Sequence, residues 1–282
     1  MSAALAVTAT AVLFATGGAA VKASSLEAWQ IAGLRSLVAF VVLLALVPAT
    51  RTGWTKGVWA AGLPYAGVML LFVHANTLTT AATTTLLQAS APIYVALLSP
   101  LLLGERPSSR RLMLLPVFLV GVWLLLSSSE QATTLARNPA LGRWLAAGAG
   151  LCYGLVLLAL RRFEGGGRPG TALRAVACGN LIAAVLALPF SLQGPQPGAT
   201  DLFVVGYLGA IQIALAYALL VPAMRVLPAF DVSLLLLLEL VASPLFAWWL
   251  HGETLTARTL AGGAVITAAC LLQAAPSWRR RG

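Results

Sequence analysis

Apolar runs long enough to cross a membrane follow one another along almost the whole chain, and this feature limits the fold more than any other. A helix that crosses the roughly 30 Å hydrocarbon core of a bilayer needs about 20 apolar residues. Of the 282 residues, 60% are hydrophobic and 9% are charged, whereas soluble domains average roughly 45–50% and 25%. A soluble core cannot bury so much apolar surface. The sequence therefore predicts an all-α integral membrane protein.

Charged residues, Gly and Pro, and polar clusters divide the apolar runs into ten predicted transmembrane helices. Their approximate bounds are 3–21, 29–49, 57–76, 81–103, 111–128, 141–160, 172–190, 202–223, 231–250 and 257–275. The connections are short, and the longest, near residues 129–141, is too short for a soluble domain. The first run has no basic segment before its apolar core, so we interpret it as a retained span rather than a signal peptide.

The positions of the basic residues predict the orientation in the membrane. If the N-terminus is cytoplasmic, most of the 18 Lys and Arg residues face the cytoplasm, including the pairs Arg110–Arg111 and Arg161–Arg162. The outer loops then hold only Lys22, Arg137, Arg143 and Arg258. Because cytoplasmic loops are enriched in Lys and Arg, we expect both termini in the cytoplasm. This distribution explains the net charge of +10 without a nucleic-acid partner.

Two segments of the chain match each other at one constant offset and without a gap. The identical pairs include Gly104 and Gly252, Glu105 and Glu253, Leu86 and Leu234, and Leu112 and Leu260. Each half then contains five spans, an odd number, so the halves insert with opposite orientations. This pattern predicts two inverted repeats, residues 1–130 and 138–282, which is typical of secondary transporters with a site near the bilayer midplane. The alternative is a chance match between two span ends.

These residues resemble the drug/metabolite transporter superfamily, and within it the ten-helix EamA-type exporters. The fourth and ninth helices of that family end in Leu-Gly-Glu, which matches Leu103-Gly104-Glu105, whereas His251 replaces the leucine before Gly252-Glu253. The family's Leu-Glu-Pro in helix nine matches Leu238-Glu239-Leu240 except for the proline, and its helix-two arginine matches Arg35. The resemblance implies an inner-membrane exporter of small metabolites. The substrates that it implies first are amino acids, including aromatic ones.

Charged residues within the predicted spans are the first candidates for a binding site, because a charge in the hydrocarbon core costs several kcal/mol. Glu239 lies near the middle of the ninth span. It can take up a proton, bind an ammonium group, or pair with Arg35 to fix helix packing. For Arg35 itself we favour structural pairing or snorkelling. His74, near the outer end of the third span, can line the cavity mouth, titrate near neutral pH, or be an interfacial residue with no fixed role.

Neutral polar and aromatic side chains complete the candidate set. Amides and hydroxyls can bind a neutral or zwitterionic solute, and rings can stack on an apolar or aromatic one. Each of these side chains can equally be a packing residue. Gln88 and Tyr94, both in the fourth span, do not share one stripe of a helix at their spacing. The candidate cavity residues are His74, Asn76, Gln88, Tyr94, Tyr153, Gln212, Tyr217 and Glu239.

Proline and glycine residues interrupt the predicted spans. Proline kinks a helix by removing a backbone hydrogen bond, and glycine permits the close approach of a neighbouring helix. Kinked helices that move against closely packed partners suit alternating access, although membrane helices also tolerate both residues without such a role. The prolines within spans include Pro64, Pro92, Pro222 and Pro244, and the glycines include Gly17, Gly148, Gly150 and Gly154.

Several functions require residues that this chain does not have. A phosphorylated sugar or nucleotide sugar requires several inward-facing cations, whereas Arg35 is the only Lys or Arg that lies well inside a predicted span. The sequence contains neither a Walker motif nor a cluster with metal-ligand spacing, and its two histidines give no basis for an enzyme. We therefore predict a monomeric secondary transporter that needs no cofactor and exports neutral or aromatic amino acids through a cavity between the repeats. The alternatives are a channel or lipid-flipping protein of the same fold, or an exporter of drugs or other metabolites.

Overall fold

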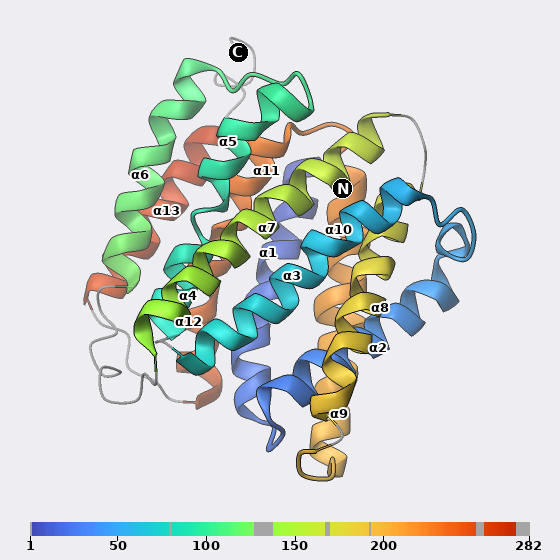
Figure 1. Ribbon diagram of the computed structural model, residues 1–282. Coiled ribbons are helices and arrows are strands. Elements are labelled where there is room, and N and C mark those ends of the chain that lie inside the picture. Colours follow the sequence, from blue (N-terminus) through green and yellow to red (C-terminus); the bar gives the residue numbers. More distant parts are fainter. Residues whose placement is uncertain are drawn as a thin grey trace.

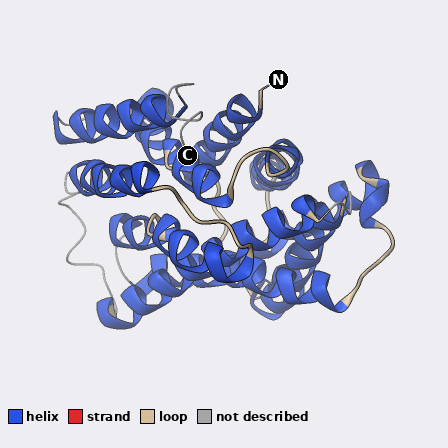
Figure 2. Ribbon diagram, turned by 90° about the horizontal axis from the view of Figure 1, so that it is seen from above, coloured by secondary structure: helices blue, strands red, loops and turns tan. Residues whose placement is uncertain are grey.

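The computed structural model describes residues 2–78, 81–126, 138–166, 170–191, 193–251 and 257–274, and these residues form helices and loops without strands (Figure 2). The first half of the chain contains α1 (Ala3–Lys22), α2 (Ala28–Leu46), the 3₁₀ turn η1 (Pro48–Thr50), α3 (Lys56–Leu78), α4 (Ala81–Gln88), α5 (Ala91–Leu102) and α6 (Ser109–Leu126). The second half contains α7 (Pro139–Gly165), α8 (Thr171–Ser191), α9 (Ala199–Tyr207), the π-helix η2 (Leu208–Leu215), α10 (Ala216–Ala223), α11 (Ala229–Leu236), α12 (Leu238–His251) and α13 (Ala257–Ala274). When interrupted helices are joined, the described residues form the ten predicted segments.

The lengths and surfaces of these segments suit a membrane. Six of them are long and apolar enough to cross it: Ala28–Leu46, Lys56–Ala75, Ala140–Gly165, Thr171–Ser191, Ala199–Ala223 and Ala229–Phe246. The outer surface is also apolar, since Leu101, Trp144 and Phe203 each expose at least 75% of their area. Such a surface is unfavourable in water and is matched by lipid chains. The chain is therefore a multi-pass membrane protein.

Some boundaries differ from the predicted ones. The second helix ends at Leu46 rather than at residue 49, because Pro48 has no amide hydrogen with which to continue it and instead begins η1. The sixth segment is longer than 141–160, since Asn138 accepts a hydrogen bond from the amide of Leu141 and so caps α7. The last residues of the predicted span 111–128 lie outside the described part of the chain.

Two predicted continuous helices are interrupted near their centres. The span 81–103 consists of α4 and α5, with Ala89 and Ser90 between them. Pro92 causes this break because it cannot donate the next helical bond, and Ser90 instead donates its hydroxyl to the carbonyl of Leu87. The span 231–250 likewise consists of α11 and α12, with Leu237 between them.

The predicted span 202–223 changes helix type in its middle third, where α9 widens into η2 before α10 begins. π-helical segments are rare and frequently occur at functional sites. Gly209 lets η2 lie directly against α2, since a Cβ atom there would be 2.6 Å from the carbonyl oxygen of Arg35. Gln212 belongs to this π segment.

The helices of the two sequence halves interleave (Figure 1). α3 packs against α7 and α8, α2 lies along α8 and η2, α1 contacts α10 and α12, and α6 pairs with α13. The α1–α2 connection and α9 lie at one end of the bundle, drawn at the bottom of Figure 1, and the α5–α6 connection lies at the other. We refer to these as the α1–α2 end and the α5–α6 end.

Hydrogen bonds hold α2 and α8 together at both ends. At the α1–α2 end, the amide nitrogen of Gln30 donates to the carbonyls of Ser191 and Pro195 at 3.1 and 2.9 Å. At the α5–α6 end, the guanidinium of Arg174 donates twice to the carbonyl of Ala49, at 2.9 and 2.6 Å. This helix pair is therefore a fixed part of the bundle.

Candidate functional site

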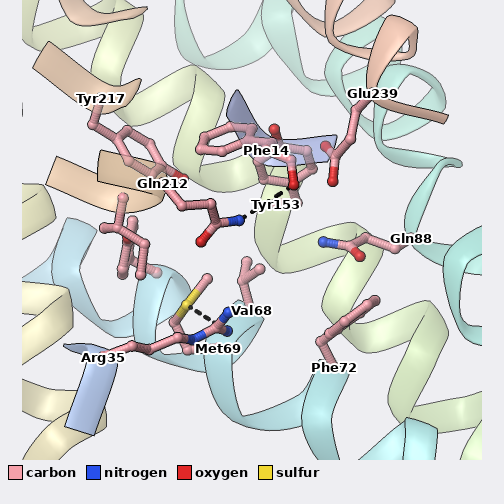
Figure 3. A pocket seen from close by; sticks show the side chains of 12 residues that line it. Phe14, Arg35, Val68, Met69, Phe72, Gln88, Tyr153, Gln212, Tyr217 and Glu239 are labelled. Atoms are coloured by element: carbon pink, nitrogen blue, oxygen red, sulfur yellow. Dashed lines mark hydrogen bonds between the residues drawn. The ribbon is translucent and has the colours of Figure 1, made fainter. Parts of the chain in front are cut away.

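Two adjoining cavities, of about 480 and about 100 Å³, lie inside the bundle between helices of both halves. We call them together the central cavity. Figure 3 shows side chains that line the smaller one. The larger part extends to Val21 and Ala28, at the α1–α2 end, and the smaller part is also lined by Tyr65 and Tyr217. The two parts share the lining residues Phe14, Arg35, Phe72, Gln88, Tyr153, Gln212 and Glu239.

Arg35 and Glu239 supply opposite charges to the walls of the central cavity (Figure 3). Glu239 lies in the first turn of α12, directly after the break at Leu237. Neither side chain belongs to an ion pair within the described part of the chain. The structure therefore does not contain the packing pair between Glu239 and Arg35 that the sequence left open as one alternative.

Several neutral polar atoms in the cavity are buried without a hydrogen-bond partner among the described residues. They include Oε1 of Gln212 and the hydroxyl of Tyr153. The Nε2 atom of Gln212 donates to the carbonyl of Phe14 at 3.4 Å. Gln88, the last residue of α4, brings a second amide into the cavity from the break that precedes Pro92. Buried polar atoms without partners are costly, and a bound solute would satisfy them.

Aromatic rings form much of the remaining wall. The ring of Tyr217 lies 5.4 Å from that of Phe14 and 5.3 Å from that of Tyr65, measured between centroids. Phe14 and Phe72 line both parts of the cavity. Aromatic rings at these spacings attract one another and offer a firm apolar surface. The cavity can therefore hold a solute that has both charged and apolar parts.

Glycines on α7 bring this helix against the break between α4 and α5. A Cβ atom at Gly150 would lie 2.6 Å from the carbonyl oxygen of Leu87, and one at Gly154 would lie 3.1 Å from the Cβ of Tyr94. The close approach that the sequence predicted for these glycines thus has a definite partner. Tyr153, also on α7, and Gln88 both line the central cavity.

Five of the candidate cavity residues meet in the central cavity: Gln88, Tyr153, Gln212, Tyr217 and Glu239. Tyr94 lines neither part, because its Cβ packs against α7 at Gly154. His74 lies near the α1–α2 end, with its Nδ1 atom 3.0 Å from the carbonyl of Leu70 and its ring 3.8 Å from that of Trp29. The side chain of Asn76 lies outside the described part of the structure.

Three residues that line the central cavity were not among the candidates predicted from the sequence. Phe14 and Phe72 carried no signal that separates them from ordinary packing residues. Arg35 was interpreted as structural or snorkelling, but it lines both parts of the central cavity. Its signal was present, since every other Lys or Arg lies in a loop or within the first three residues of a predicted span.

The α5–α6 end is closed around Glu105, in the connection after α5. Its Oε1 atom accepts a 2.6 Å hydrogen bond from Nε of Arg161, and its Oε2 atom accepts one of 3.3 Å from the amide of Ala229. A second nitrogen of Arg161 donates to the carbonyl of Met224. Glu105 thus joins the α5–α6 connection to the end of α7 and the start of α11.

Two further ion pairs lie at the same end. Nε of Arg111 is 3.3 Å from Oδ1 of Asp231, which joins α6 to α11. Nε of Arg225 is 2.6 Å from Oε2 of Glu164, whose side chain is fully buried. The central cavity extends toward the opposite end, at Val21. The bundle is therefore hollowed toward one end and tied by ion pairs at the other.

A helical membrane bundle around a central cavity, hollowed toward one end and lined by both polar and aromatic side chains, is an arrangement that can hold a small solute within the membrane. The EamA-like transporter family matches residues 1–127 and 140–274. The chain belongs to this family. Its members are transporters rather than enzymes, so the protein is a membrane transporter of small molecules.

The chain is also similar to individual proteins. An "uncharacterized transporter" of Archaeoglobus fulgidus is 29% identical over 209 residues, which are 74% of this chain and 71% of the relative. A solved protein crystal structure superposes with a TM-score of 0.79 at 21% identity, over 99% of both chains. At that identity the second comparison shows the fold alone.

Proposed function

We propose that the protein is a secondary transporter that exports small zwitterionic metabolites, foremost neutral and aromatic amino acids. The observation that carries this proposal is Glu239, a carboxylate without an ion-pair partner among the described residues, in the wall of a central cavity. A substrate ammonium group would satisfy this charge, and the free hydroxyl of Tyr153 would bind alongside it. The larger part of the cavity, about 480 Å³, falls within the roughly 300–1,000 Å³ usual for small-molecule sites.

We propose further that residues 1–130 and 138–282 form two inverted repeats. α4 and α11 are both 8 residues long, and they begin at Ala81 and Ala229, which are related by the same offset as Gly104 and Gly252. Each of them ends at a break in the middle of its span. The packing also has counterparts, since α3 contacts α7 as α10 contacts α1, α4 contacts α7 as α11 contacts α1, and α5 contacts α7 as α12 contacts α1. These correspondences support the repeat and the inverted orientation of its halves.

Alternating access follows from this arrangement. With both termini in the cytoplasm of an inner-membrane protein, the α1–α2 end faces outward and the tied α5–α6 end faces the cytoplasm. The structure would then correspond to an outward-facing state. Exchange to the inward-facing state requires the contacts of Glu105 to separate while the α1–α2 end closes. The central cavity lies inside the bundle of one chain, and we propose that a monomer transports the solute.

Counterflow in proteoliposomes tests the proposed function. Purified protein is reconstituted, the vesicles are loaded with one unlabelled neutral, aromatic or charged amino acid, and uptake of the labelled compound is measured against protein-free vesicles. We expect saturable uptake that internal substrate accelerates, with neutral and aromatic amino acids preferred. Uptake that neither saturates nor accelerates would indicate a channel, and transfer of labelled lipid between leaflets would indicate a lipid-flipping protein. No uptake of any amino acid would contradict the proposal and favour drugs or other metabolites.

A further inference from the structure

The guanidinium of Arg35 differs from the other arginines of the bundle in what surrounds it. Within the described residues, the Nη2 atom donates a hydrogen bond only to a thioether sulfur, that of Met69, at 3.5 Å, and the Nε atom is buried without a hydrogen-bond partner. By contrast, Arg51 donates to the carbonyls of Leu44 and Ala45 at 2.8 and 2.7 Å, near the end of the same helix. The guanidinium of Arg35 therefore has no counterpart, among the described residues, of the backbone hydrogen bonds that hold Arg51.

A guanidinium in this position requires an anion. It carries its charge at every physiological pH, and it presents five donors in a planar fork that matches the two oxygens of a carboxylate. A thioether is a weak acceptor and cannot balance the charge. The other charged residue that lines both parts of the cavity, Glu239, forms no ion pair with Arg35 in the described structure. A solute carboxylate would supply the missing partner.

The backbone holds Arg35 in place without help from its side chain. Its carbonyl oxygen lies against η2 at Gly209, where a Cβ atom would approach to 2.6 Å. The helix that carries it is tied to α8 at one end through Gln30 and at the other through Arg174. The guanidinium therefore projects into the cavity from a fixed wall, while its donors stay available (Figure 3). A group placed in this way is ready to bind before the solute arrives.

We infer that Arg35 binds the carboxylate of the transported solute, so that the substrate class is α-amino acids rather than amines, alcohols or sugars. The inference rests on the proposed transport of zwitterions, in which Glu239 receives the ammonium group. Arg35 on α2 and Glu239 on α12 then hold the two charges of one zwitterion from different halves of the chain (Figure 3). The side chain of the solute contacts Phe14 and Phe72.

Binding of three matched compounds tests the inference separately from transport. L-phenylalanine has both charges, phenethylamine lacks the carboxylate, and phenylpropionate lacks the ammonium group. The shift of the thermal unfolding midpoint of the purified protein is titrated with each compound for the wild type, for Arg35→Gln and Arg35→Lys, and for Arg143→Gln, an exposed arginine at the start of α7. Size-exclusion chromatography checks that each variant is folded.

We expect the wild type and Arg143→Gln to bind phenylalanine at least about tenfold more tightly than phenethylamine, because the amine forgoes a charge-assisted bidentate contact. Arg35→Gln loses this preference, and Arg35→Lys retains part of it. Equal binding of phenylalanine and phenethylamine by the wild type would overturn the inference even if the Arg35 variants do not fold. Unchanged preference in Arg35→Gln would also overturn it.

The same measurements separate this inference from the proposed function. Carboxylate binding that depends on Arg35, in a protein that shows no counterflow, would contradict transport and uphold the binding role. Saturable counterflow of amino acids with an unchanged half-saturation concentration in Arg35→Gln would uphold transport and overturn the binding role.

Discussion

Glu105 and Arg161 are joined by a hydrogen bond of 2.6 Å between Oε1 and Nε, at the end of the bundle that lies opposite the open side of the central cavity. The contact connects the loop after α5 with the last turns of α7, which belong to different halves of the chain. In an alternating-access cycle, contacts between the halves at the closed end must separate before solute can leave there. The pair is thus a place where the conformational balance can be measured.

Glu105→Gln should shift this balance toward opening of the α5–α6 end. The two side chains are 19% and 25% exposed, so we expect an effect of about 1 kcal/mol, or roughly a fivefold change in population. The reporter is the buried Ser99 on α5, replaced by cysteine in a chain without its three native cysteines. Its alkylation by a permeant maleimide should accelerate in Glu105→Gln and stay unchanged in Arg106→Gln, an exposed neighbour. Equal rates in all three proteins would contradict a role in closure.

Arg225→Gln should destabilise the protein more than the double variant that also contains Glu164→Gln. The carboxylate of Glu164 is fully buried, whereas Arg225 is about half exposed. Removing the arginine leaves a buried charge unpaired, which costs roughly 3–5 kcal/mol, and the second substitution removes that charge. Thermal unfolding of both single variants and the double variant checks this. A double variant no more stable than Arg225→Gln would show that the pair contributes nothing specific.

Gly150→Ala and Gly148→Ala form a matched pair on α7. A methyl group at Gly150 would lie 2.6 Å from the backbone carbonyl of Leu87, which cannot move without disturbing the break between α4 and α5. At Gly148 it would lie 3.4 Å from a leucine methyl, an ordinary contact. We expect Gly150→Ala to cost about 1–3 kcal/mol of unfolding free energy and to weaken transport, and Gly148→Ala to be nearly neutral. Similar behaviour of both variants in thermal unfolding and counterflow would contradict this packing.

Tyr153→Phe and Tyr94→Phe form a matched pair. Each removes one phenolic hydroxyl, the first from α7 and the second from α5, and these two helices pack against each other. The hydroxyl of Tyr153 lies in the cavity and lacks a partner within the described residues, whereas Tyr94 does not line the cavity. Loss of one hydrogen bond to a charged solute corresponds to about 1.5–3 kcal/mol. Tyr153→Phe should therefore raise the half-saturation concentration in counterflow by about tenfold or more, with Tyr94→Phe unchanged. An effect of Tyr94→Phe as large as that of Tyr153→Phe would place the site elsewhere.

The membrane class, the ten segments and most of their bounds could be predicted from the sequence because they depend on local apolar length. The breaks could not be placed in the same way. The sequence shows Pro92 within the predicted span. Whether a proline bends a helix or divides it into two depends on what packs against it, which here is α7 at Gly150. The π-helical turn around Gln212 and the break at Leu237 contain no proline at all. The π-helical segment instead has a close contact with a distant helix, α2, at Gly209.

The lining of the central cavity was predicted in part for the same reason. Gln88, Gln212 and Glu239 were found as polar residues at the depth of the membrane, where polarity requires an explanation. Tyr94 and His74 met the same criterion but face other helices. The sequence of one helix does not show which of its faces will point into the cavity, because that depends on how the neighbouring helices pack against it. Arg35 was undervalued because a snorkelling arginine and a cavity arginine have the same local sequence. Only the position of α2 against η2 separates the two interpretations.

The central claim is that Glu239 receives the ammonium group of a zwitterionic substrate in the cavity. The most direct test is counterflow of the best amino acid by reconstituted wild type, Glu239→Gln and Glu239→Asp, with folding checked by size-exclusion chromatography. We predict saturable uptake by the wild type, partial uptake by Glu239→Asp, and a loss of at least about tenfold in Glu239→Gln, because a neutral amide cannot balance the ammonium charge. Saturable uptake by Glu239→Gln with wild-type rate and half-saturation would contradict the claim and leave Glu239 a packing residue.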